Sequence, residues 1–138
     1  MRRTFCGIVM LTSVLAVGGC DNDVDTTTPT GPAPTITETF SGTIVVNGAA
    51  THTFVIAAAG LVSATLTEVT PDATVPVGMA LGRWNGANCE IILPKDDAIQ
   101  GFVLTGQASG PGTLCARIYD PASRLTQALN YTITVVHP

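Results

Sequence analysis

Hydrophobic and polar residues alternate with a period of two from residue 39 onward, and turn residues interrupt the alternation every eight to twelve positions. This pattern is typical of an antiparallel β-sandwich. It predicts eight short strands, at residues 39–46, 51–58, 61–69, 77–84, 89–94, 101–106, 113–120 and 130–137. No stretch has the spacing of an amphipathic helix, so the predicted fold class is all-β.

The same alternation predicts which side chains face the core. Within residues 61–69, Val62, Ala64 and Leu66 share one face of the strand, and mostly polar side chains occupy the other. The dipeptide Asn47-Gly48 between the first two strands is a strong signal for a β-hairpin. We therefore expect strands with one buried and one solvated face.

The first nineteen residues follow a different plan. Two arginines precede an apolar run that is too short to span a bilayer as a helix, and small residues end it. These are the parts of a secretory signal peptide. The ending VGGC (17–20) resembles the lipobox of bacterial lipoproteins, which implies cleavage after residue 19 and lipidation of Cys20. The alternative is an ordinary signal peptide with Cys20 unmodified.

Residues 20–36 are rich in Thr, Pro, Gly and Asp and show no apolar periodicity, which predicts a flexible linker. The predicted organisation is thus a signal peptide (1–19), a lipidated cysteine with its linker (20–36) and a β-sandwich domain (37–138). The expected location is the bacterial cell envelope, with the lipid anchor in a membrane and the domain facing the periplasm or the cell surface.

The charge of the chain changes after residue 20. Four basic and ten acidic residues follow, which gives that part a net charge of −6, and the basic residues do not cluster. A nucleic-acid partner is therefore not expected.

The cysteines of the predicted domain are Cys89 and Cys115, and a protein that leaves the reducing cytoplasm favours a disulfide between them. Because Leu114, Ala116 and Ile118 alternate with Cys115, we expect the bridge on the outer face or at an edge of the sandwich. Two cysteines without a Cys-x-x-Cys motif do not indicate a redox or zinc site.

Two segments, TFSGTIVVNGAATHTFVIAAAGLVSATL (39–66) and GPGTLCARIYDPASRLTQALNYTITVV (110–136), carry a family resemblance. They resemble the opening strands and the closing hairpin of the bacterial pre-peptidase C-terminal domain. That resemblance implies a jelly-roll-like β-sandwich, in a family that is usually appended to secreted proteases and in some members binds polymers or calcium. No protease sequence precedes the domain here and the cysteine pair is additional, so the binding role is not carried over directly.

Catalytic motifs are missing from the sequence. The histidines are His52, which shares a strand face with Phe54 and Ile56, and His137. No Gly-x-Ser-x-Gly elbow, phosphate-binding loop or His-Glu-x-x-His motif occurs. We therefore predict a protein that is not an enzyme.

Two small groups of residues are candidates for ligand binding. Trp84, with Asn85 and Asn88, could stack on a sugar ring, whereas the alternative is a tryptophan that closes one end of the core. Asp96 and Asp97, in a predicted loop near Glu90, could hold Ca²⁺, whereas the alternative is a solvated turn in which Lys95 is the partner. No other cofactor is predicted.

Together these patterns predict a lipid-anchored envelope protein with a non-catalytic β-sandwich that serves as a binding, interaction or structural module. The alternative is an accessory carbohydrate- or calcium-binding domain that serves a separate secreted hydrolase. The expected partners are the membrane, through the anchor, and another envelope protein or a polysaccharide.

Overall fold

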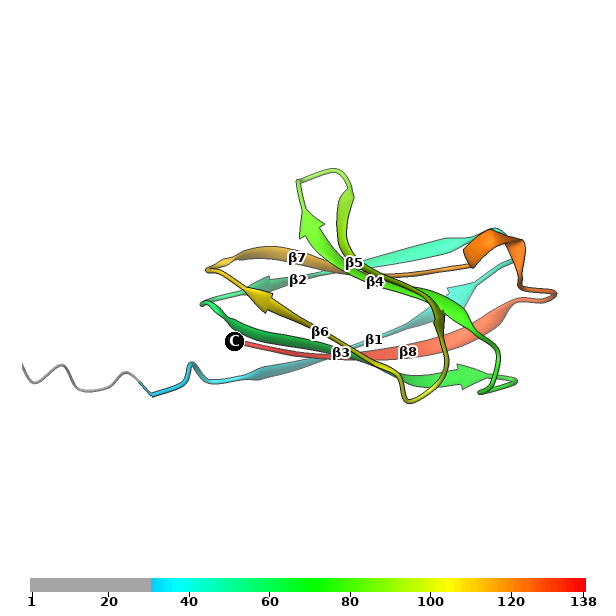
Figure 1. The fold of residues 1–138 in the computed structure, drawn as a ribbon, viewed down its shortest axis with the longest axis horizontal. Coiled ribbons are helices and arrows are strands. Elements are labelled where there is room, and N and C mark those ends of the chain that lie inside the picture. The colour runs from blue at the N-terminus through cyan, green and yellow to red at the C-terminus, as the bar shows by residue number, and fades with distance from the viewer. Residues whose placement is uncertain (1–30) are drawn as a thin grey trace, which may run out of the picture. The chain divides into compact units, whose positions relative to one another are not determined.

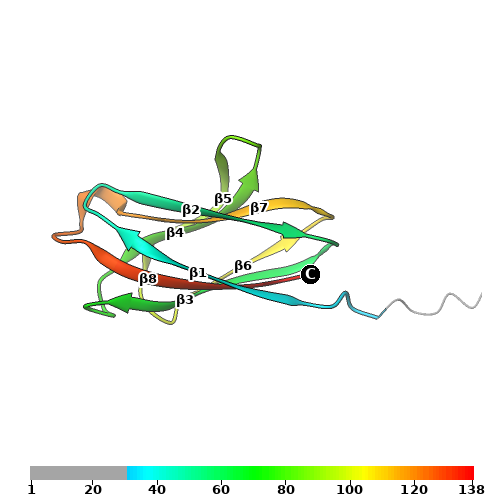
Figure 2. The same ribbon diagram turned by 180° about the vertical axis from the view of Figure 1, so that it is seen from behind.

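The computed structural model describes residues 31–138, which form two packed antiparallel sheets (Figures 1 and 2). The strands are β1 (Ile36–Ile44), β2 (Ala49–Ile56), β3 (Gly60–Thr70), β4 (Val77–Trp84), β5 (Cys89–Ala98), β6 (Val103–Ala108), β7 (Gly112–Tyr119) and β8 (Leu129–His137), and a short 3₁₀ turn, η1 (Pro121–Ser123), precedes β8. Sheet A has the order β1-β8-β3-β6 and sheet B the order β2-β7-β4-β5. This is the strand order of a jelly roll, so the predicted all-β sandwich of eight strands is confirmed.

The predicted signal peptide, Cys20 and most of the predicted linker lie outside the described residues. No helix within residues 31–138 is long and apolar enough to cross a membrane.

The core lies between the two sheets and is filled from both inner faces. Val62, Ala64 and Leu66 are buried as predicted, and Phe54 and Ile56 contribute from β2. The other fully buried members of the core include Val77, Met79, Ile118, Leu129, Ile133 and Val135. Burial of these apolar side chains is the main source of the domain's stability.

Strand β5 differs from its prediction. The alternation stops at Pro94, and a strand was expected to end there, but β5 continues through Lys95, Asp96 and Asp97 to Ala98. Proline has no N–H to donate to a sheet, so it is tolerated where one side of a strand lacks a partner. β5 is the edge strand of sheet B, and that position explains why Pro94 does not end it.

The outer face of sheet A carries a continuous layer of hydroxyl side chains, which we call the hydroxyl face. Strand register places these side chains on the side of the sheet opposite the core. They are Thr37, Thr39, Ser41 and Thr43 on β1, Thr132 and Thr134 on β8, Ser63, Thr65 and Thr70 on β3, and Thr105 on β6, with Asn130, Gln107, Glu68, Leu61, Val103 and Val136 among them. Glu68 is the one residue of this set with a charge.

The outer face of sheet B is different. Strand β7 places Cys115, Arg117 and Tyr119 on it. The Tyr119 ring lies against Gly78 of β4, where any added Cβ would overlap the ring. The two faces therefore have different chemistry although both are built from strands of similar length.

Candidate functional site

The candidate site is built around the hairpin of β4 and β5, which rises above the rest of sheet B (Figure 1). Gly82 allows this hairpin to bend, because a Cβ at that position would lie 2.2 Å from the backbone oxygen of Glu90. The pairing between β4 and β5 also shifts register at this point. A bulge and a glycine together turn the hairpin tip away from the sheet.

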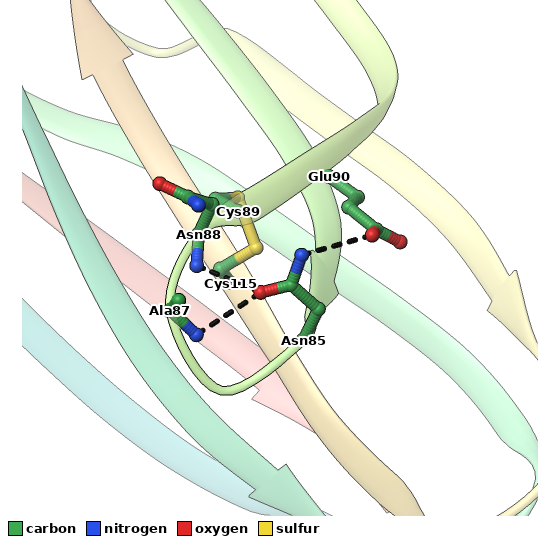
Figure 3. Close-up of a disulfide and its surroundings, with 6 residues drawn as sticks. All are labelled: Asn85, Ala87, Asn88, Cys89, Glu90 and Cys115. Atoms are coloured by element: carbon green, nitrogen blue, oxygen red, sulfur yellow. Dashed lines mark hydrogen bonds between the residues drawn. A yellow bond between two sulfur atoms is a disulfide. The ribbon is translucent and has the colours of Figure 1, made fainter.

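Asn85 organises the turn at the tip of the hairpin (Figure 3). Its side-chain oxygen accepts hydrogen bonds from the backbone N–H groups of Ala87, at 3.0 Å, and Asn88, at 2.8 Å. Its side-chain nitrogen donates to Glu90 Oε1 at 2.9 Å. These bonds form an Asx turn that holds the loop in one conformation.

The disulfide between Cys89 and Cys115 fixes the hairpin to β7 (Figure 3). Cys115 lies opposite Gly82 of β4 and Thr53 of β2, on the outer side of sheet B, so the predicted placement is confirmed. It is nevertheless completely buried, whereas Cys89 is half-buried. The bridge therefore joins a bent hairpin tip to a central strand of the sheet.

Trp84 lies at the end of β4 beside a hollow of about 380 Å³, which we call the Trp84 groove. Its lining residues are Ile56, Arg83, Trp84, Ile92, Gln107, Ala108, Ser109, Gly110, Pro111, Gly112, Thr113 and Leu114. Among the described residues, Trp84 belongs neither to the core nor to the partly buried hydrophobic residues packed against it. The tryptophan is half-buried and lines the groove together with Ile56 of the core.

The groove combines apolar and polar walls. Ile92 and Leu114 lie on its apolar side, which continues into a crevice of about 80 Å³ between the sheets. Arg83, Ser109 and Thr113 also line the groove, and their side chains carry hydrogen-bonding groups. An aromatic ring beside a few polar groups is a common arrangement in sites for small polar ligands.

The structure separates the three residues that were grouped with Trp84 on sequence grounds. Trp84 lines the groove, but the side chain of Asn85 is used within its own turn. Asn88 is exposed at the hairpin tip and does not line the groove. Of the three, Trp84 alone contributes to the hollow.

The three carboxylates proposed for calcium do not come together. Asp96 and Asp97 lie in β5 and not in a loop, and six residues of strand place Glu90 about 20 Å away along it. Tyr119 donates its hydroxyl to Asp96, while Lys95 Nζ lies 2.7 Å from Asp97 Oδ1. No group of three or more His, Cys, Asp or Glu side chains converges within residues 31–138.

These contacts shift two pKa values. The hydrogen bond from Lys95 and its positive charge hold the pKa of the Asp97 carboxyl below its usual range. Burial, followed by the hydrogen bond to Asp96, raises the pKa of Tyr119 to about 12. Asp96 and Asp97 are therefore engaged with neighbouring side chains of this chain.

Both histidines have structural partners. His52 is half-buried and stacks on Phe40, with Nε2 2.7 Å from the hydroxyl of Tyr131. Burial lowers the pKa of the His52 imidazole. His137 is fully buried between Glu38, 2.9 Å from Nε2, and the backbone oxygen of Pro138, 3.0 Å from Nδ1. In the part of the chain that the structure describes, neither ring bonds a serine or threonine hydroxyl.

Sequence reasoning missed most of the groove. Arg83 and Gln107 lie on different hairpins, and the loop 109–111 completes the wall with Gly112 and Thr113 at the start of β7. The one local signal was the run SGPG at 109–112, which marks a turn next to a strand. Nothing in its spacing points to Trp84, because the two segments meet only after the sheets form.

Comparison with protein-family models found no match to the chain. A comparison with curated proteins found none either. The resemblance to the pre-peptidase C-terminal domain therefore stays an expectation from the sequence, while the jelly-roll strand order is seen directly in the structure.

Proposed function

We propose that the chain is a lipid-anchored protein of the bacterial cell envelope whose β-sandwich is a non-catalytic binding module, with the Trp84 groove as its ligand site. The observation that carries the proposal is a half-buried tryptophan beside a hollow of about 380 Å³, on a hairpin held by a disulfide. A site on a fixed scaffold loses little conformational entropy when a ligand binds.

The chemistry of the groove favours a saccharide as its ligand. The apolar face of a sugar ring packs well on an indole, and the sugar hydroxyls need donors and acceptors around it. Arg83, Ser109 and Thr113 line the groove with Trp84 and carry both kinds of group. This supports the accessory carbohydrate-binding role as the more specific form of the proposal, whereas the separated carboxylates give the calcium-binding role no support.

The anchor can be tested by the intact mass of the protein from its native membrane fraction. We expect a mass of residues 20–138 plus acyl chains, because the lipobox pattern implies lipidation of the Cys20 thiol and cleavage before that residue. Cys20→Ser is expected to remove the acyl mass and to release the domain from the membrane. An unmodified wild-type protein in the culture fluid would contradict the proposed anchor.

Binding at the groove can be followed by fluorescence, since Trp84 is the one tryptophan of the chain. Titration of the full chain in detergent with soluble β-1,4-linked oligosaccharides of glucose or N-acetylglucosamine should shift the emission of Trp84. Calorimetry should show that Trp84→Ala weakens this binding at least about tenfold, as expected for an aromatic residue at the centre of a site.

The matched control is Ile99→Ala, which shortens an exposed apolar side chain in the β5–β6 loop, outside the groove. This variant should bind as the wild type does. If the oligosaccharides bind without changing the emission of Trp84, or if Trp84→Ala binds as well as Ile99→Ala, the groove is not the saccharide site.

A further inference from the structure

The hydroxyl face carries little charge. Every outward position of β1 from Thr37 to Thr43 is a threonine or serine, and all four are exposed. Across the sheet, Glu68 is the one outward residue with a formal charge. Residues 31–138 carry eleven charged side chains, so charge is concentrated elsewhere on the domain.

Strand register aligns these side chains in rows that run across the strands. Thr39, Thr134 and Thr65 occupy directly opposed positions on β1, β8 and β3. Neighbouring strands lie about 4.7–4.9 Å apart, which is close to the length of one sugar residue in an extended polysaccharide. The face therefore presents hydrogen-bonding groups at a repeat that a glycan chain shares.

Hydrogen bonds hold several of these side chains in fixed positions. Thr43 donates to Asn130 at 2.6 Å, and the hydroxyls of Ser41 and Thr132 lie 3.0 Å apart. Thr132 also donates to Glu68 at 3.3 Å. Each hydroxyl has one donor and two acceptor positions, so these groups keep unused acceptor positions on the open side. A hollow of about 490 Å³ lies on this part of the face, and Ser41, Thr43 and Thr132 are among the residues that line it.

Strand formation alone does not require such a face. Threonine favours strands, but the outer face of sheet B holds fewer hydroxyls: β7 places Thr113, Cys115, Arg117 and Tyr119 there, and β2 adds Thr51 and Thr53. β7 is a central strand of its sheet, as β8 is of sheet A. The excess of hydroxyl side chains is therefore specific to the outer face of sheet A.

We propose that the hydroxyl face is a second binding surface, on which a neutral, extended polysaccharide lies across β1, β8 and β3. An uncharged partner is favoured because the face offers no cation to an anionic polymer and its carboxylate, on Glu68, would repel one. A single chain is favoured over a planar lattice such as ice, because neighbouring strands are rotated by about 20–25° and a chain can follow that twist. The proposal does not depend on the Trp84 groove.

Affinity electrophoresis of the full chain in detergent tests the proposal, with gels that contain hydroxyethylcellulose, mixed-linkage β-glucan or galactomannan. Retardation of the wild type is expected with at least one polymer. Thr39→Lys/Thr65→Lys places two long cations in one row and should reduce the affinity at least about tenfold. The matched control is Thr51→Lys/Thr53→Lys, which adds the same charge to the outer face of β2 and should change the affinity less than about twofold.

A third variant, Thr39→Val/Thr65→Val/Thr134→Val, removes hydroxyls but keeps side-chain shape and strand propensity, so it serves if the lysine variant does not fold. It should also lose retardation. The proposal is overturned if the wild type is not retarded by any of the three polymers, or if the β2 control loses as much affinity as the variants of the face.

Two further results would also overturn the proposal, and they would distinguish its failure from a failure of the proposed Trp84 groove. Loss of retardation in Trp84→Ala alone would assign polysaccharide binding to the groove. The second result is that the wild type partitions into slowly growing ice, that the valine variant does not, and that no polymer retards the wild type in the gel. The hydroxyl face would then bind ordered water instead of a polysaccharide.

Discussion

Removal of the bridge by Cys89→Ala/Cys115→Ala is expected to lower the free energy of unfolding by about 3 to 4 kcal/mol. The two cysteines are 26 positions apart, and the bridge restricts the unfolded chain by closing the loop between them. Cys115 is completely buried, so alanine also removes packing there. Urea unfolding followed by far-UV circular dichroism, without reductant, measures the loss.

The wild type treated with a reductant provides the control for this pair of substitutions. It should unfold at nearly the same urea concentration as the double variant, because both lack the cross-link. A wild type whose midpoint does not move on verified reduction would show that the bridge contributes little. In the variant, weaker saccharide binding at Trp84 with an intact fold would indicate that the bridge also positions the groove.

Replacing Ile133 by alanine is expected to destabilise the domain by about 2 to 5 kcal/mol. Ile133 is fully buried on β8, directly opposite Phe40 of β1 and Leu66 of β3. The shorter side chain would leave a cavity where both neighbouring strands contribute to the core. Chemical unfolding at constant pH measures this effect, with the slope of the transition as a check on two-state behaviour.

Thr134→Ala, at the next position of the same strand, is the control for Ile133→Ala. Its side chain points out of the core onto the hydroxyl face, so a loss below about 1 kcal/mol is expected. Equal losses for the two substitutions would contradict the assignment of inner and outer faces along β8.

The strands were predictable because their signal is local. A period of two and turn residues such as Asn47-Gly48 are visible within a few positions, and each predicted strand overlaps an observed one. The extension of β5 beyond Pro94 was not predictable in this way. Proline ends a strand where a neighbouring strand requires a backbone N–H at that position, which proline lacks. Pro94 is tolerated because β5 is an edge strand, and that edge position is a property of the whole sheet.

The candidate site was predictable only in part. Trp84 stood out as a single tryptophan among amides, and the cysteine inventory indicated the bridge. The amide of Asn85 is used in its own turn, and Gln107 enters the groove from another hairpin. The grouping of Glu90 with Asp96 and Asp97 failed because the residues between them form a strand, which extends the chain.

The pairing of β1 with β8 has a consequence for how the protein is made. Ile36 pairs with His137, so the first strand of the domain finds its partner only when almost the whole domain sequence is available. Contacts between such distant segments slow folding. A chain that stays unfolded until its last strand emerges remains competent for passage through a translocation channel, as the signal-peptide pattern at its start would require.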